Sequence, residues 1–240
     1  MQDSTRVLAG DCTVTYENGR TTTQRGEVVV LVKPDNTVLV HDDAGYQPAA
    51  WLTRPNSVQF ERDTSGFALV ATKNEERLRV DSNADYGSAH YPVTPAGPTV
   101  GTCPDCASTL VRDGARVTCL GCRTAYALPR DATLTETTCE DCGLPTFRAD
   151  RGDTFECCLD RTCDSLDDAV IGAFDAEWTC RCGSLLGIER RRALDAVCPD
   201  CDAVYRIPSG VVDGACDCGL PAFDTPSGRR CLDATCDRNQ

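Results

Sequence analysis

Residues 139–147 read CEDCGLPTF, and residues 216–223 read CDCGLPAF. Each stretch is followed by a second cysteine pair, CLDRTC at 158–163 and CLDATC at 231–236. Two close cysteine pairs separated by 12 to 15 residues are typical of a tetrahedral thiolate zinc site, because each tight turn supplies two sulfurs to one metal. These stretches predict that bound metal, more than a hydrophobic core, holds this part of the chain together.

A second repeated stretch precedes each of these. Residues 119–129 read CLGCRTAYALP, and residues 198–208 read CPDCDAVYRIP. Of the 18 cysteines, 16 fall into two copies of one arrangement, which predicts four small zinc ribbons in two tandem repeats. The predicted ligands of the first copy are Cys103, Cys106, Cys119, Cys122, Cys139, Cys142, Cys158 and Cys163, and those of the second are Cys180, Cys182, Cys198, Cys201, Cys216, Cys218, Cys231 and Cys236.

The repeat resolves an ambiguity between two adjacent cysteines. Cys158 aligns with Cys231 of the second copy, whereas Cys157 aligns with Arg230. We therefore predict that Cys158 is a metal ligand and that Cys157 is not. Cys12 is the other cysteine without a partner in the pattern.

The size of the ribbons argues for structural metal. A unit of roughly 30 residues is too small to build a sufficient core and needs a staple. Disulfides are the alternative, but no apolar signal segment follows Met1, so we expect a cytoplasmic, reducing location. Four thiolates leave no open position for water, so we predict four structural zinc ions. Ligand type alone leaves iron as the competing metal.

The charge pattern is acidic and poor in lysine. The formal net charge is −13, and Lys33 and Lys73 are the two lysines among 24 basic residues. This composition favours a protein adapted to molar salt, although an ordinary acidic protein would also show it. Because salt weakens phosphate contacts steeply, a protein working in molar salt would depend more on stacking of bases on aromatic rings.

The first 91 residues predict an all-β domain, a sandwich or half-open barrel. Short runs rich in Val, Leu and Thr alternate with turns of Gly, Asn and Asp, and only residues 75–79 hint weakly at a helix. Residues 92–100, with three prolines, predict a linker. The ribbon pairs are predicted at 101–166 and 178–240, with a connecting segment at 167–177 and a short helix at 165–174 capped by Ser165. No stretch is apolar enough to predict a membrane span.

The N-terminal domain resembles that of the NucS-type, mismatch-directed DNA endonucleases. The motifs are CTVTY at 12–16 followed by Gly19 and Arg20, LVKPDNTVLVH at 31–41, and PAAW at 48–51. In that family the domain forms the dimer contact and binds single-stranded DNA. The resemblance implies Arg20 and Trp51 as DNA contacts. Tyr46 stands where the family often has a basic residue and is a candidate second stacking ring.

Two further comparisons bear on activity. The nuclease core of that family needs an acidic residue and then Glu-x-Lys, but Leu31 and Ala71 stand two positions before the lysines. We therefore predict no enzyme activity. The second and fourth ribbons resemble the zinc modules at the C-terminal end of type IA topoisomerases, whose pattern is Cys-x-x-Cys-Gly-x-Pro, then an aromatic residue, then a cysteine and a final cysteine. The fourth ribbon has one residue fewer in its first cysteine pair. In the topoisomerases those modules bind single-stranded DNA, which the resemblance implies for these ribbons.

Several side chains have two readings from sequence. Trp51 stacks on a base or fills the β-domain core, and Arg20 contacts phosphate or is a solvated turn residue. Trp178 is an exposed stacking ring or packs between modules. The basic run at 190–192 is a solvated hairpin tip or a phosphate contact. Recurrence favours core packing for four aromatics, Tyr126, Tyr205, Phe147 and Phe223, and His41 is expected to be structural.

The sequence as a whole predicts a non-catalytic, zinc-dependent protein that binds single-stranded or junction DNA in repair, replication or recombination. A homodimer through the N-terminal domain and contacts with repair or replication proteins are expected from the resemblance. The alternative is a protein-interaction adaptor whose ribbons dock onto replication or transcription machinery. A third hypothesis is thiol redox chemistry at the close cysteine pairs.

Overall fold

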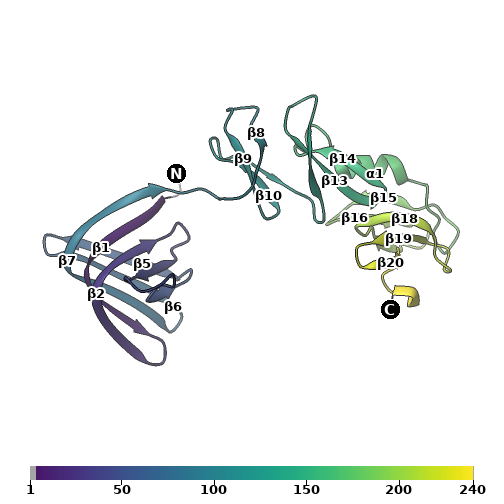
Figure 1. Cartoon of the computed structure of the whole chain (residues 1–240). Helices are drawn as coiled ribbons and strands as arrows, with labels where there is room; N and C mark the ends of the chain where they lie inside the picture. Colours follow the sequence, from purple (N-terminus) through teal and green to yellow (C-terminus); the bar gives the residue numbers. More distant parts are fainter. Residues whose placement is uncertain (1–3, 240) are drawn as a thin grey trace. The chain divides into compact units, whose positions relative to one another are not determined.

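A computed structural model gives the fold of residues 4–239 (Figure 1). The chain divides into two compact units, Met1–Thr94 and Pro95–Gln240. Among the described residues, no helix is long and apolar enough to cross a membrane.

The N-terminal unit is one antiparallel sheet with the strand order β4-β3-β2-β1-β7-β6-β5. It curls into a half-barrel (Figure 1), so of the two predicted forms the half-open barrel is confirmed. Its strands are β1 (Ser4–Glu17), β2 (Thr21–Val32), β3 (Val38–His41), β4 (Ala50–Leu52), β5 (Ser57–Asp63), β6 (Gly66–Lys73) and β7 (Glu76–Pro92).

Alternation along the strands fills the concave side of this sheet. Leu8, Gly10, Cys12 and Val14 of β1 are buried, while the residues that alternate with them are partly exposed. Successive side chains of a strand point to opposite faces, so this alternation places one apolar face inward. The weak helical pattern at 75–79 is wrong, because Lys73 pairs with Glu76 in the β6–β7 hairpin and Asn74 takes a positive φ of 54° in its turn.

The C-terminal unit contains the four predicted ribbons. Ribbon 1 is the sheet β11-β10-β9-β8, and ribbon 3 is the sheet β15-β16-β17. The strands of ribbon 1 are β8 (Thr99–Thr102), β9 (Thr109–Asp113), β10 (Arg116–Cys119) and β11 (Ala125–Ala127). Those of ribbon 3 are β15 (Gly187–Arg190), β16 (Leu194–Val197) and β17 (Val204–Arg206).

Ribbons 2 and 4 share one six-stranded sheet. Ribbon 2 comprises β12 (Thr133–Thr138), β13 (Pro145–Gly152) and β14 (Thr154–Cys158), and ribbon 4 comprises β18 (Gly210–Ala215), β19 (Pro221–Thr225) and β20 (Gly228–Cys231). They join where β13 pairs in parallel with β18, at Arg151↔Gly210 and Gly152↔Val211. The two tandem repeats are therefore fused edge to edge.

A short helix packs over this junction. Helix α1 (Leu166–Phe174) begins after Ser165, whose hydroxyl accepts a hydrogen bond from the Asp168 N–H at 3.4 Å, as predicted. The ring of Phe174 stacks on Trp178 with centroids 4.8 Å apart, and Trp178 meets Phe223 edge to face at 5.7 Å. The helix thereby links ribbon 2 to ribbon 4 through an aromatic cluster. A 3-10 turn, η1 (Asp237–Asn239), follows the last strand.

Candidate metal centres and nucleic-acid interface

The structure gathers the sixteen patterned cysteines into four groups of four. Within each group, the sulfur atoms all lie within 4.8 Å of one another. Short strands and tight turns place each pair: in ribbon 1, for example, the Ala107 N–H donates to the Cys103 carbonyl at 2.9 Å and the Arg123 N–H donates to Cys119 at 3.2 Å. Each such turn, called a knuckle below, presents two thiols on the same side.

The sulfur spacing fits a tetrahedral metal. Four thiolates about 2.3 Å from a zinc ion have sulfur–sulfur edges of about 3.8 Å. Paired sulfurs across the knuckles lie 3.4 and 3.8 Å apart in ribbon 1, 3.3 and 3.6 Å in ribbon 2, 3.4 and 3.6 Å in ribbon 3, and 3.4 and 3.8 Å in ribbon 4. None of the cysteines within the described range forms a disulfide. The four groups can therefore each hold one zinc ion.

In ribbons 1, 2 and 3, hydrogen bonds within a knuckle lower the pKa of one cysteine thiol. The Ser108 backbone N–H and hydroxyl lower the pKa of Cys106 to about 6. The corresponding groups of Ser184 lower the pKa of Cys182 to about 6, and N–H groups within its own knuckle lower that of Cys139 to about 7. Hydrogen bonds to the charged form of an acid stabilise that form. In each of these groups the thiolate form of this one cysteine is thus favoured before the metal binds, whereas the pKa values of Cys103, Cys163 and Cys201 in the same groups are raised.

An arginine lies between the cysteine groups of ribbons 3 and 4. Arg181, between Cys180 and Cys182, forms an ion pair with Asp233 at 2.9 Å. Burial raises the pKa of Cys218, but the Leu220 N–H and the Arg181 guanidinium outweigh it and bring the pKa to about 6. Because a loaded four-thiolate site carries excess negative charge, this cation offsets charge between two neighbouring sites.

The adjacent cysteines of β14 differ in surroundings. The Cys158 sulfur lies 3.3 Å from that of Cys142, whereas Cys157 is buried and belongs to none of the four groups. Burial raises the pKa of Cys157, and likewise that of the buried Cys12, to about 11. The structure thus places both unpatterned thiols in apolar surroundings.

The N-terminal unit places Trp51 outside its core. Trp51 is 51% exposed, between the buried Ala50 and Leu52 of β4. Its ring borders a shallow depression of about 170 Å³ whose other lining includes Tyr16 and Gln24. One interpretation of the sequence placed Trp51 in the core of the β domain. The alternation of buried and exposed side chains along β4 excludes that interpretation. Tyr16 and Gln24 were not identified from the sequence as neighbours of Trp51, since only the folded sheet brings β1, β2 and β4 together.

The other two predicted DNA contacts lie near this depression in the chain but do not line it. Arg20 is exposed in the turn between β1 and β2, two residues before Thr22, which does line the depression. Tyr46 is 89% exposed in the loop between β3 and β4, three residues before the lining residue Ala49. Both side chains are accessible to a ligand.

The aromatics of the C-terminal unit are packing residues. Phe147 and Phe223 are buried, and Tyr126 and Tyr205 pack against the same core, as predicted. Trp178 is also buried and contacts Phe174 and Phe223, so the packing reading holds and the exposed stacking reading does not. Of the basic run, Arg190 pairs with Asp167 and Arg191 with Glu189.

The N-terminal and C-terminal parts of the chain are similar to different known proteins. The family model for the endonuclease NucS N-terminal PH-like domain matches residues 2–94. The endonuclease NucS of Methanocaldococcus jannaschii is 33% identical over 78 residues, covering 31% of this chain and 29% of that protein. DNA topoisomerase 1 of Methanothermobacter thermautotrophicus is 37% identical over 98 residues, covering 37% of this chain and 13% of that protein.

Solved structures give partial matches of the same kind. An EndoMS complex with double-stranded DNA matches with a TM-score of 0.36 and 22% identity, over 41% of this chain and 42% of that one. A repair endonuclease from Pyrococcus abyssi matches with a TM-score of 0.33 and 18% identity, over 40% and 42%. The chain thus spans less than a third of the endonuclease NucS relative and a small part of the topoisomerase. Residues 2–94 thus match the endonuclease NucS N-terminal PH-like domain, and the topoisomerase similarity fits the cysteine-rich remainder.

Proposed function

We propose that this protein is a non-catalytic DNA-binding protein that holds single-stranded or junction DNA during repair, replication or recombination. The observation that carries this proposal is the exposed indole of Trp51 beside a depression lined by Tyr16 and Gln24. An exposed ring beside polar groups is suited to stacking on an unpaired base, which is worth about 1–3 kcal/mol per base. Arg20 and Tyr46 supply a phosphate contact and a second ring.

The relatives support a role on DNA. Residues 2–94 match the NucS N-terminal domain, and the similarity to part of a DNA topoisomerase fits the remainder of the chain. Both named proteins are DNA enzymes. The family match nevertheless stops at residue 94, and neither of the two lysines has an acidic residue two positions before it. We therefore propose binding without cleavage.

The ribbons complete the proposal as structural zinc modules. Each group of four thiols closes the coordination sphere, so the zinc would stabilise the fold and activate no water. Exposed ribbon surfaces are then available to the same DNA or to repair and replication proteins. We extend the proposal to a cytoplasmic homodimer that associates through the N-terminal unit.

The test is a fluorescence-anisotropy titration of labelled single-stranded, forked and double-stranded DNA with zinc-loaded protein in molar KCl. We expect preference for the single-stranded and forked substrates, and about five- to a hundredfold weaker binding by Trp51→Ala. Val29→Ala, which truncates another exposed apolar side chain of the same unit, is the matched control and should bind normally. Equal affinity of Trp51→Ala and the unaltered protein would argue for a protein-interaction adaptor instead.

A further inference from the structure

Basic side chains converge on one groove of the C-terminal unit. The groove has a volume of about 730 Å³ and is lined by segments of ribbons 2, 3 and 4 and by the start of α1. Seven arginines and two aspartates line it, in a chain whose formal net charge is −13. This local excess of positive charge is opposite in sign to the whole molecule.

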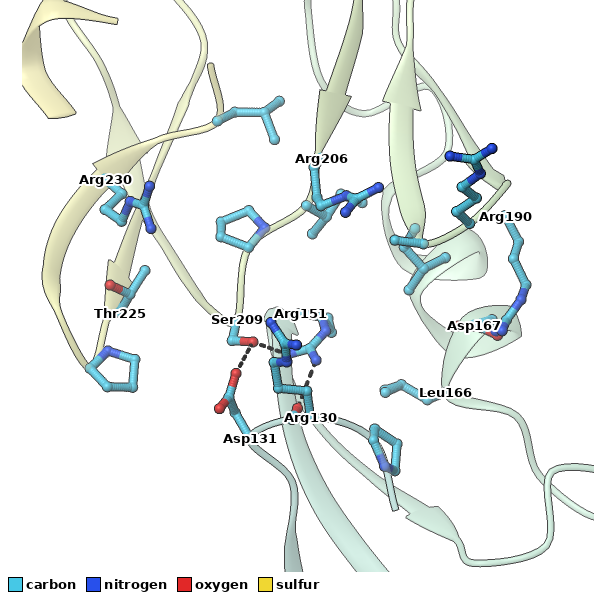
Figure 2. Close-up of a pocket in the computed structure, with 18 of the residues that line it drawn as sticks. Arg130, Asp131, Arg151, Leu166, Asp167, Arg190, Arg206, Ser209, Thr225 and Arg230 are labelled. Carbon is cyan, nitrogen blue, oxygen red and sulfur yellow. Dashed lines mark hydrogen bonds and ion pairs between the residues drawn. The ribbon is translucent and has the colours of Figure 1, made fainter. Parts of the chain in front are cut away.

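Three of these arginines have partners that fix the groove. Arg151 donates to the Ser209 hydroxyl at 2.7 Å and to the Arg130 carbonyl at 2.8 Å, and the Ser209 hydroxyl donates to Asp131 at 2.7 Å (Figure 2). Arg190 pairs with Asp167, and Arg206 lies 3.5 Å from Asp195. The contacts of Arg151 join ribbon 2 to the segment that leads into β18, the Arg190 pair joins ribbon 3 to α1, and the Arg206 pair lies within ribbon 3.

Four arginines remain without such partners. Within residues 4–239, no hydrogen bond or ion pair engages the guanidinium groups of Arg130, Arg161, Arg192 and Arg230, and all four side chains are exposed. They come from the loop before β12, from the knuckle between Cys158 and Cys163, from the β15–β16 turn and from β20. Unpaired guanidiniums around a preformed groove are suited to bidentate contacts with an anion.

We propose that this groove binds the phosphate backbone of a single-stranded nucleic acid, with Arg130, Arg161, Arg192 and Arg230 as its phosphate contacts. A nucleic-acid strand carries one negative charge per nucleotide, so it supplies a series of anions to guanidiniums spread over three modules. The inference rests on the proposed function and adds a second DNA-contacting surface, distinct from that around Trp51. It also assigns a role to one residue of the basic run, Arg192.

The chain offers matched control positions. Arg229 and Arg230 are neighbours on β20, but Arg229 donates to the Asp213 carbonyl at 2.7 Å and does not line the groove. Arg191, next to Arg192, pairs with Glu189 at 3.2 Å outside the groove. The double variants Arg192→Gln/Arg230→Gln and Arg191→Gln/Arg229→Gln therefore remove the same charge from adjacent positions.

The experiment measures binding of a labelled oligothymidylate to the full zinc-loaded chain as a function of KCl concentration. Each lost phosphate contact reduces the slope of log affinity against log salt by about 0.7 for a single strand. We expect the groove double variant to bind more weakly and to lose about 1.4 from this slope, whereas the control double variant keeps the slope. Zinc content and melting temperature of each variant verify the fold, and Arg130→Gln against Arg116→Gln on ribbon 1 provides a second matched pair.

Different outcomes separate this inference from the proposed function. If Trp51→Ala weakens binding but the two double variants behave alike, the groove is not a nucleic-acid site while the proposed function stands. If a labelled oligoglutamate loses affinity for the groove double variant and the oligothymidylate does not, the groove is a site for acidic protein segments and the inference is overturned. If the unaltered protein binds no oligonucleotide in any salt, both proposals fail together.

Discussion

Cys157 and Cys158 occupy successive positions of β14, so their side chains point to opposite faces of the strand. Only the Cys158 sulfur joins the group formed with Cys139, Cys142 and Cys163. The internal repeat was sufficient to predict this from sequence, because Cys157 aligns with an arginine in the second copy. A shift of the β14 register by one residue would have placed Cys157 in the metal group and Cys158 in the core.

A pair of substitutions tests the assignment. We expect Cys158→Ala to reduce bound zinc from four ions to three per chain and Cys157→Ala to retain all four, at a stability cost of about 1 kcal/mol for the lost core sulfur. Zinc is quantified by atomic emission on purified protein. Loss of zinc from Cys157→Ala with retention in Cys158→Ala would reverse the assignment.

The remaining two thiols should be unreactive in the native protein. Burial raises the pKa of both Cys12 and Cys157 to about 11, so at pH 8 roughly one thiol in a thousand is the reactive thiolate. We expect alkylation of the zinc-loaded protein at pH 8 to modify neither, and denaturation with chelator to expose all 18 cysteines. Rapid modification of the patterned cysteines in zinc-loaded protein would support the thiol redox hypothesis instead.

At the scale of elements, helix α1 depends on a glycine in the neighbouring strand. Gly152, at the end of β13, has a φ of +90°, and an added Cβ would lie 2.5 Å from Cε2 of Phe174. The absence of a side chain at this position therefore allows α1 to approach the junction of β13 and β18. The sequence indicated the helix and its cap, but gave no sign of this contact.

Gly152→Ala should therefore destabilise the C-terminal unit, by about 1–3 kcal/mol, through backbone strain and displacement of Phe174. The matched control is Gly172→Ala within α1, where an added Cβ meets nothing within 4 Å and where alanine should stabilise by about 0.5–1 kcal/mol. Urea unfolding monitored by circular dichroism measures both. Equal stability of the two variants would contradict the packing argument.

At the scale of the molecule, the two units are stabilised in different ways. The N-terminal unit has its own core of buried aliphatic residues, while the core of the C-terminal unit includes cysteines of all four groups. Metal binding to such sites is coupled to folding. Removal of metal should therefore affect one unit and spare the other.

The two tryptophans report on this difference. Trp178 is buried in the C-terminal unit, and Trp51 is half exposed in the N-terminal unit. Chelation should unfold the C-terminal unit and shift the fluorescence emission of Trp178 to longer wavelength. The Trp51→Phe variant, in which Trp178 is the remaining tryptophan, should show the same shift. Retention of the native Trp178 emission after all zinc is removed would show that the ribbons fold without metal.

The sequence by itself determined the ribbon count, the groups of thiols and the β character of the first unit. These features depend on residues close together in the chain, on knuckles and strand alternation, and on an internal repeat that aligns one copy with the other. Only the tertiary structure decided that ribbons 2 and 4 share a sheet, that Trp178 is buried, and that Trp51 is exposed. It also gathered arginines from ribbons 2, 3 and 4 into one groove. Several of these contacts join segments that are distant in the chain, as Arg151 and Ser209 do, and local patterns carry no information about which distant surfaces pack together.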